Sequence, residues 1–500
     1  MSVVTARLPL MTTYAPGADP RRWKALAVLG LIQFMLILDV TVVNVALPSI
    51  KSTLDMSESG LAWVVEAYVL AAGGLLLLGG RLSDLIGRRT MFVVGVALFG
   101  IASAVCGGAH NVLFFHHGSM MNVSRFVQGV GEAIAAPASL GIIAVLFTDP
   151  AERIKALGIF GGLAGLGGTS GTVISGFITH LDWRWIFFIN VPVAVVAILL
   201  VPRLVDESKS AKAHRPDFLG AITGTSGLLA IVYGLLHASD HSWGDKGVLL
   251  PIFIGLALVA LMVFIEARSS DPLIPLSFFR NRTRVVTNFV TLFFSTAFFS
   301  YFFLLTLVEQ QNMDWGSIKS GLSYLPFGFG IGLGIGVGTG MMPRVGVKRL
   351  LALGFALDAV GMALSTRIGT ADPHSISYSA DILPGMILLA LGSGLSFPAI
   401  GNASLHEVTG EDSSLAAGLQ QAIQQIGGAL GLATLASIAT KYALHHNGNL
   451  AQGAVAPFWI GAVSLAIGGV LVLLLMEHVL AIPQNPLAAA AESELEEGVA

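Results

Sequence analysis

Residues 80–90 read Gly-Arg-Leu-Ser-Asp-Leu-Ile-Gly-Arg-Arg-Thr and lie between two long apolar stretches. Three arginines and an aspartate are too costly to place in lipid, so this segment is predicted to be a short turn at one face of a membrane. Gly80 and Gly87 allow a tight turn and a close approach of the flanking helices. Because lysine and arginine accumulate in cytoplasmic loops, we expect the turn on the cytoplasmic side.

The composition of the chain is that of a membrane protein. Of its 500 residues, 54% are hydrophobic and only 11% are charged, whereas soluble domains carry about 25% charged residues. The formal net charge of −3 gives no reason to expect a nucleic-acid partner. The single cysteine, Cys106, excludes an intramolecular disulfide framework and a cysteine-based metal cluster. We expect no metal site and no cofactor.

Fourteen apolar stretches are long enough to cross a membrane, which takes about 20 residues per helix. The first stretch is too long for a cleavable signal peptide and is interpreted as a retained helix. The expected fold class is therefore all-α integral membrane. The stretches are 24–49, 60–80, 90–108, 119–147, 154–178, 184–202, 216–237, 247–267, 284–308, 319–341, 349–366, 381–405, 414–438 and 457–477.

The positions of the basic residues predict the orientation. If the N-terminus is cytoplasmic, most of the 27 lysines and arginines fall in cytoplasmic segments, as the positive-inside rule requires. An even number of crossings then places the C-terminus in the cytoplasm as well. The loop at 407–412 has no positive charge and is an exception.

An internal repeat suggests two related bundles. The turn at 80–90 has a degenerate copy at 338–348, with Pro343 at the position of Asp84. Repeated six-helix halves with a binding site between them are a transporter architecture. The expected organisation is a cytoplasmic segment 1–23, a six-helix bundle 24–202, two inserted linker helices in 216–267, a second six-helix bundle 284–477 and a cytoplasmic tail 478–500.

Ionisable side chains inside apolar helices are the sharpest functional signal, because each is costly unless it is paired or hydrated. Asp39 lies in the first stretch and Glu66 in the second. The fourth carries Arg125, Gln128 and Glu132 at positions i, i+3 and i+7, which share one face of a helix. The sequence therefore predicts a polar stripe that faces a cavity.

Depth along the helices suggests how these side chains pair. Counting 1.5 Å per residue from the helix ends places Asp39 near the depth of Glu132, and Arg125 near that of Glu66. A carboxylate held beside another in a low dielectric can load and release a proton as water access changes sides. We expect Asp39, Arg125, Glu132 and Glu66 to couple transport to protons; a purely structural polar network is the alternative.

The stretch 154–178 is rich in glycine and includes Gly167, Gly171, Thr172 and Gly176. Small residues let two helices touch closely and bend. One interpretation is that these residues only allow close helix packing. The other is that they form a closely apposed seam between the two halves, which slides during transport.

The stretch 284–308 is rich in phenylalanine, with aromatic residues on all sides of the helix. Many of them must face lipid or core. A subset facing a cavity, Phe294, Phe298 and Tyr301, would together with Gln128 suit hydrophobic or aromatic ligands, and cations through cation–π contacts.

Six segments, in order along nearly the whole chain, carry motifs of one family. They are 38–48 (Leu-Asp-Val-Thr-Val-Val-Asn-Val-Ala-Leu-Pro), 80–90, 125–131 (Arg-Phe-Val-Gln-Gly-Val-Gly), 183–192 (Trp-Arg-Trp-Ile-Phe-Phe-Ile-Asn-Val-Pro), 272–276 and 420–428. Together they resemble the fourteen-helix drug:proton antiporters of the major facilitator superfamily, the multidrug efflux type.

The resemblance implies alternating access, export of hydrophobic compounds and coupling to the proton gradient. It implies a coupling role for Asp39 and Arg125, and we expect Asp84 to latch the inner side between the halves. The antiporter motif of the fifth helix departs from the family at Thr172, where proline is usual, and at Ser175, where glycine is usual. This departure weakens the case for strict antiport. The residues that match the family's cytoplasmic gate are Gly80, Asp84, Gly87, Arg88 and Arg89.

The expected function is export of drugs or antibiotics by a multi-pass transporter of the bacterial plasma membrane. Its partners would be hydrophobic or cationic small molecules, protons and the lipid bilayer, and it would act as a monomer. A lipid or lipid-like cargo on the same fold is the alternative. A non-transporting sensor is disfavoured because no soluble signalling domain is seen, and an enzyme because the loops lack nucleophile–base or metal-ligand spacing.

Overall fold

The computed structural model describes residues 20–110, 118–147, 149–209, 217–238, 241–269, 272, 276–369, 375–408 and 413–477. The described chain is all-α, as expected, and each of the fourteen apolar stretches is mainly helical, although 184–202 and 319–341 are each divided between two helices. The first part consists of α1 (Arg22–Leu54), α2 (Glu58–Ile86), α3 (Arg88–Gly107), α4 (Ser119–Leu146), α5 (Pro150–Leu181), α6 (Trp185–Phe188) and α7 (Asn190–Leu204).

Two helices follow as an antiparallel pair, and a second group completes the chain. The pair is α8 (Phe218–His237) and α9 (Lys246–Arg268). The second group consists of η1 (Leu276–Arg280), α10 (Arg282–Leu307), the π-helical η2 (Val308–Asn312), α11 (Ser317–Ser323), α12 (Leu325–Val345), α13 (Val347–Ser365), η3 (Thr366–Ile368), η5 (Tyr378–Ile382), α14 (Leu383–Ser404), α15 (Ser413–His445), α16 (Leu450–Gly453) and α17 (Val455–Leu475).

Polar side chains begin several of these helices. Ser57 accepts a hydrogen bond from the backbone N–H of Gly60 at 3.0 Å at the start of α2, and Asp149 accepts one from Glu152 at 2.9 Å at the start of α5. Asn281 does the same for α10. Such caps satisfy the free N–H groups of a first helical turn.

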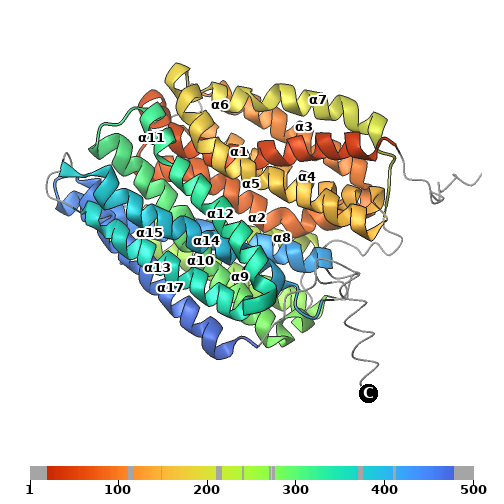
Figure 1. Cartoon of the computed structure of the whole chain (residues 1–500). Helices are drawn as coiled ribbons and strands as arrows, with labels where there is room; N and C mark the ends of the chain where they lie inside the picture. The colour runs from red at the N-terminus through yellow and green to blue at the C-terminus, as the bar shows by residue number, and fades with distance from the viewer. Residues whose placement is uncertain are drawn as a thin grey trace, which may run out of the picture.

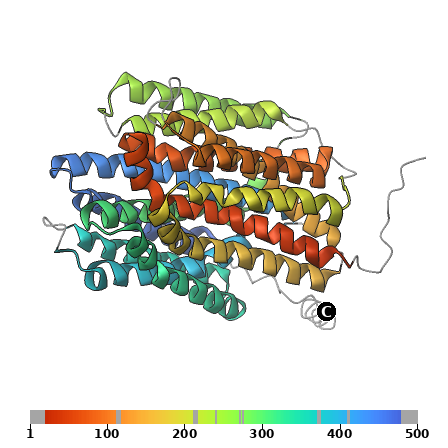
Figure 2. The same ribbon diagram turned by 90° about the horizontal axis from the view of Figure 1, so that it is seen from above.

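The helices pack as two groups with a pair of helices beside them. In the first group α2 and α3 pack on α4, and α1 packs on α5. In the second, α13 and α12 pack on α14, and α10 packs on α15. Figure 1 shows the first group, red to yellow, and the second, green to blue, lying against each other. The pair α8–α9 contacts α2 and α15 through α8 and runs along one flank of the molecule (Figure 2).

Close backbone contact between α3 and α4 depends on glycine. A Cβ atom on Gly95 would lie 2.7 Å from the carbonyl oxygen of Gly131. In the second group, a Cβ on Gly361 of α13 would lie 2.8 Å from the carbonyl oxygen of Gly385 in α14. Small residues at helix crossings of this kind allow tight packing in a membrane.

Twelve helices of the described chain are long and apolar enough to cross a membrane. They do not include α5 or α13, two of the fourteen expected crossings. α13 has only 19 residues and carries Lys348, Arg349 and Asp358. The structure therefore supports a multi-pass membrane protein with twelve candidate spans, fewer than the fourteen expected.

The two repeated turns both contain a glycine with positive φ. Gly87 lies between α2 and α3 with φ 138°, and Gly346 lies between α12 and α13 with φ 82°. Positive φ of this kind favours glycine. The shared geometry fits the internal repeat of the sequence. We call the end of the molecule with these turns the Gly87 end, and the opposite end, where α1 stops and α2 starts, the Leu54 end.

Candidate functional site

A buried ion pair joins α1 to α4. The guanidinium of Arg125 donates to a carboxylate oxygen of Asp39, and both side chains are only 1% exposed. Arg125 also donates to the carbonyl oxygen of Val64 in α2 at 2.9 Å and to the amide oxygen of Gln128 at 2.9 Å. Its guanidinium lies 4.2 Å from the ring centroid of Tyr68. One arginine thus connects three helices.

Polar side chains from α3 and α7 complete this network. Asn190 donates to Asp39 at 2.8 Å, and Gln128 donates to Asp39 at 3.3 Å and to the hydroxyl of Ser103 at 2.7 Å. The thiol of Cys106 donates to Gln128 at 3.3 Å. We call these side chains, with Arg125 and Tyr68, the Asp39 network. The sequence analysis did not identify Ser103, Asn190 or Cys106 as members of such a network.

The structure corrects the expected pairing of Arg125 with Glu66, since Arg125 pairs with Asp39 instead. Depths counted from the helix ends gave the wrong partner for Arg125 because α4 has 28 residues. At 1.5 Å per residue it is about 42 Å long, which exceeds the hydrocarbon thickness of a bilayer. Its ends therefore do not mark the two membrane planes.

Glu132 lies on the edge of the Asp39 network. It is 6% exposed, near the Tyr68 hydroxyl and within electrostatic range of Asp39. Its Oε2 atom has no hydrogen-bond partner among the described residues, and neither does the Tyr68 hydroxyl. The expected stripe of Arg125, Gln128 and Glu132 therefore faces one buried polar region.

Glu66 lies elsewhere. Its side chain is fully buried on α2, beside the backbone of Ala433 in α15. Neither carboxyl oxygen has a hydrogen-bond partner in the described part of the chain. Glu66 is thus a buried acid at the contact between the two helix groups, separate from Arg125.

At the Gly87 end, the gate residues are held within the first helix group. Arg88 donates to Asp84 at 2.8 and 3.0 Å, and the described hydrogen bonds of Asp84 go only to this neighbour. A Cβ on Gly141 in α4 would lie 2.9 Å from the side chain of Arg88. In this structure Asp84 therefore closes its own turn, whereas the expected latch would join the two halves.

Glu207, which the sequence reading missed, caps α3 from the segment after α7. Its carboxylate accepts hydrogen bonds from the backbone N–H groups of Arg89 and Thr90, each at 3.0 Å, and from the Thr90 hydroxyl. Partial burial opposes ionisation, but the bonds from Thr90, Arg89 and Ser208 outweigh it and lower the pKa of Glu207. The cap fixes the turn after Gly87.

We expect Glu207→Gln to lower the free energy of unfolding by about 1 kcal/mol near pH 7, as loss of a helix cap does. A lowered folded-state pKa means that the carboxylate stabilises the fold above its unfolded pKa, about 4.3, and that this contribution disappears as the pH falls through the folded value. Thermal unfolding of the purified protein in detergent tests this prediction. A stability difference between variant and wild type that persists at about pH 3 would contradict it.

The glycines of α5 contact both helix groups. A Cβ on Gly167 would lie 2.8 Å from the carbonyl oxygen of Phe34 in α1, and one on Gly171 would collide with Thr41. Gly176 faces α11, where Ser317 donates to its carbonyl oxygen at 3.1 Å. Only Gly176 of these three meets the second group. The side chain of Thr172 lies outside the described residues.

The aromatic residues of α10 pack into the second helix group. Phe294 is 2% and Tyr301 0% exposed. Ring centroids of Phe294 and Phe298 lie 5.0 and 5.7 Å from that of Phe397 in α14. Tyr301 packs on Phe458 at 5.5 Å. In this structure these side chains form an aromatic core, and Gln128 belongs to the Asp39 network.

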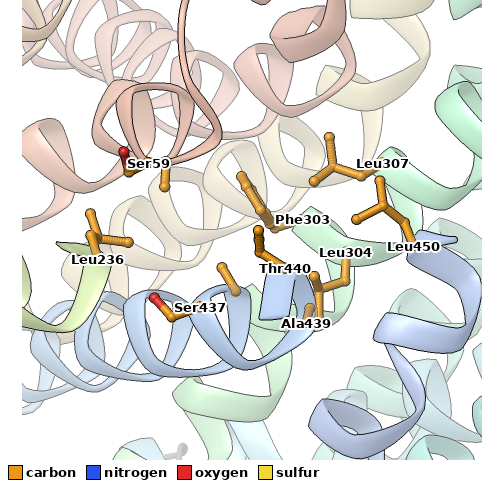
Figure 3. A pocket seen from close by; sticks show the side chains of 11 residues that line it. Ser59, Leu236, Phe303, Leu304, Leu307, Ser437, Ala439, Thr440 and Leu450 are labelled. Atoms are coloured by element: carbon orange, nitrogen blue, oxygen red, sulfur yellow. The ribbon is translucent and has the colours of Figure 1, made fainter. Parts of the chain in front are cut away.

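A small apolar pocket lies at the other face of α10, towards the Leu54 end. Figure 3 shows side chains from α2, α8, α10, α15 and α16 around it. Phe303 contributes to it, and the three aromatic residues expected in a cavity do not. The lining residues are Ser59, Ala62, Leu236, Phe303, Leu304, Leu307, Ala436, Ser437, Ala439, Thr440 and Leu450.

Two buried acids of the second helix group had no assigned role. Asp358 in α13 is fully buried and accepts hydrogen bonds from Ser393 at 3.1 Å and Ser396 at 3.4 Å. Glu309 in η2 is also fully buried. A charged residue inside an apolar stretch was a sufficient signal for Asp358, but Glu309 lies just beyond the stretch 284–308.

Comparison with known proteins settles the family. The model of the Major Facilitator Superfamily matches residues 29–432. The chain belongs to the Major Facilitator Superfamily. It is therefore a secondary transporter and not an enzyme.

Curated relatives of this Major Facilitator Superfamily chain include antibiotic-resistance proteins. It is 36% identical over 436 residues to the puromycin resistance protein pur8 of Streptomyces alboniger, with 87% of this chain and 85% of the relative covered. It is 36% identical to the lincomycin resistance protein of Streptomyces lincolnensis, covering 83% and 84%. It is 29% identical to the multidrug resistance protein Stp of Mycobacterium tuberculosis, covering 82% and 74%.

Solved structures support the same superfamily fold. The D-xylose–proton symporter matches with a TM-score of 0.61 at 15% identity, over 91% of this chain and 98% of that chain. A bacterial homologue of the human lysosomal transporter Spinster matches with a TM-score of 0.62 at 16% identity, over 92% and 97%. At these identities the likeness concerns the fold alone.

Proposed function

We propose that this transporter exports hydrophobic small molecules, including cationic ones, across the bacterial plasma membrane and is driven by proton influx. The relatives named for resistance to puromycin and lincomycin support export of antibiotics or drugs. The proposal of proton coupling rests on the Asp39–Arg125 ion pair. This pair is buried where α1, α2, α3, α4 and α7 meet, and the neutral amides of Asn190 and Gln128 donate hydrogen bonds to Asp39.

The proposed topology has fourteen crossings, with α5 and α13 added to the twelve candidate spans. The helices of 24–202 and 284–477 form two six-helix bundles, and those of 216–267 link them. Both termini lie in the cytoplasm, so the Gly87 end is cytoplasmic and the Leu54 end faces outward. Lysine and arginine in the turns at the Gly87 end support this orientation. The transporter acts as a monomer.

The chemistry of the Asp39 network suits proton coupling. An unprotonated Asp39 attracts Arg125 and ties α1 to α4. A proton that forms an O–H bond on this carboxylate cancels its charge. The guanidinium of Arg125 then keeps only its contacts with Gln128, the carbonyl oxygen of Val64 and the ring of Tyr68. Interactions of buried charges are strong in a low dielectric, so one proton can shift the relative stability of two helix arrangements. Glu132 and Glu66 add further acids that can take part.

Transport by the purified protein in liposomes, with and without an imposed pH gradient, tests the proposal. The probes are puromycin, lincomycin, ethidium and a fluorescently labelled phosphatidylethanolamine. We expect gradient-driven movement of at least one of the first three. Movement of the labelled lipid alone would favour the lipid transporter instead, and movement of the drugs at the same rate without a gradient would overturn the coupling.

A further inference from the structure

Two hydrogen bonds join the two helix groups at the Leu54 end. Gln310 in η2 donates to the carbonyl oxygen of Val45 in α1 at 2.9 Å. Ser317 in α11 donates to the carbonyl oxygen of Gly176 in α5 at 3.1 Å. A Cβ on Gly176 would lie 2.7 Å from the carbonyl oxygen of Ser317, so the backbones touch here. The molecule is thus closed at this end.

Glu309 links the two elements that make these contacts. It belongs to η2, one residue before Gln310, and its Oε2 atom accepts a hydrogen bond from Ser320 of α11 at 2.7 Å. Ser320 lies one helical turn after Ser317. Glu309 therefore connects η2, which contacts α1, to α11, which contacts α5.

No cation neutralises Glu309 in the described chain. Its side chain is fully buried, its Oε1 atom has no hydrogen-bond partner, and no lysine or arginine of the described residues lies within ion-pair distance of it. Lys319 attracts the Glu309 carboxylate only through space, and its side chain is exposed and lies over the ring of Trp315 at 4.0 Å. An unpaired charge at such a site is very costly.

The other titratable groups that face Glu309 are tyrosines. The hydroxyl of Tyr324 is bonded to Thr306 at 2.8 Å, and that of Tyr378 donates to the carbonyl oxygen of Ser323 at 2.6 Å. The hydroxyl of Tyr301 has no partner among the described residues. Neutral phenols do not balance a carboxylate charge, so the closed arrangement fits a carboxyl group that carries a proton.

We propose that Glu309 is a second proton-binding site of this transporter and that its proton holds the Leu54 end closed. The inference rests on the proposed function only in assuming that the two helix groups move apart at this end. When the proton leaves to water, the O–H bond breaks and the carboxylate remains charged. That charge is stabilised only where water reaches it, so release of the proton favours separation of η2 and α11 from α1 and α5. Protonation reverses the step.

Distances between two spin labels across the Leu54 end test this latch. The labels go on Ser52→Cys in α1 and Gly316→Cys before α11, because Ser52 is exposed and a Cβ on Gly316 meets nothing within 4 Å. The native Cys106 is fully buried and does not compete for label. Wild-type protein in nanodiscs should lose most of its short-distance population between about pH 5 and about pH 9.

Glu309→Gln, which cannot lose a proton, should keep the short distance over this whole range. Asp358→Asn is the matched control: it also removes a buried acid of the second helix group, but one that Ser393 and Ser396 already satisfy. It should show the wild-type pH dependence. A Glu309→Gln profile like that of wild type would overturn the proposal.

Ser320→Ala keeps the proposal testable if Glu309→Gln does not fold. Loss of the Ser320 hydroxyl should reduce the short-distance population at every pH, and an unchanged population would contradict the latch. These distances need no substrate. A lack of drug transport would therefore overturn the proposed function without changing the label distances. Label distances that do not depend on Glu309 would overturn the latch without changing the transport result.

Discussion

Asp39→Asn should reduce gradient-driven drug transport to below about a tenth of the wild-type rate. An amide cannot carry the proton, and it leaves the charge of Arg125 buried and unpaired. Breaking one side of a buried ion pair costs about 3–5 kcal/mol of stability. The variant is therefore expected to unfold at a lower temperature as well. Transport in liposomes and thermal unfolding in detergent measure the two effects.

The double variant Asp39→Asn with Arg125→Gln separates coupling from structure. With both charges removed, no buried charge remains unpaired, and stability should return close to that of wild type. Transport should remain lost, because no proton site is restored. Recovery of transport in the double variant would show that the pair is purely structural. Asp55→Asn, at the exposed C-terminal end of the same helix, is the control and should transport normally.

Arg125→Lys gives a graded version of the same test. The guanidinium of Arg125 reaches Asp39, Val64 and Gln128 together. A lysine ammonium keeps the charge but does not reproduce this planar geometry. We expect intermediate transport and intermediate stability.

Most of the fold was predictable because it depends on local signals. Long apolar stretches can be found from the hydropathy of neighbouring residues alone, and all of them are mainly helical in the structure. The turn at 80–90 and its copy at 338–348 were recognisable because glycine is required at Gly87 and Gly346, where φ is positive. The number of crossings was not confirmed, since α5 and α13 are absent from the twelve candidate spans, and Lys348, Arg349 and Asp358 make α13 more polar than a typical span.

The site was predictable only in part because it depends on which helices meet. The stripe of Arg125, Gln128 and Glu132 follows from helical periodicity. The partner of Arg125 does not, since depth along one helix says little about depth along another. Asn190 resembles an ordinary polar residue at a helix start until α7 is placed beside α1.

Glu207 and Glu309 escaped notice for a related reason. Each lies just outside an apolar stretch, where a charge is unremarkable in sequence. Only the packed structure shows that one caps α3 and that the other is enclosed by α11 and three tyrosines. Hydrophobic patterning identifies acids within spans better than acids that the fold buries at the ends of spans.

Gly176→Val should abolish transport by forcing the two helix groups apart at the Leu54 end. Its Cβ would lie 2.7 Å from the carbonyl oxygen of Ser317 and 3.2 Å from the Cα atom of Ile318, and backbone atoms cannot rotate away as a flexible side chain can. Overpacking of this kind costs about 1–3 kcal/mol. If the two helix groups separate during transport, this cost destabilises only the arrangement in which the Leu54 end is closed. The label distances between positions 52 and 316 should therefore lengthen at every pH.

Gly336→Val is the matched control, because this glycine of α12 is exposed and a Cβ there meets nothing within 4 Å. Both substitutions place valine in a helix, so their intrinsic helix propensities cancel in the comparison. Gly336→Val should transport at the wild-type rate and keep the short label distance. Equal transport by the two variants would mean that contact between α5 and α11 is not needed in the cycle. Loss of transport in Gly176→Val with unchanged label distances would place its effect in local packing and rule out a seam that must close.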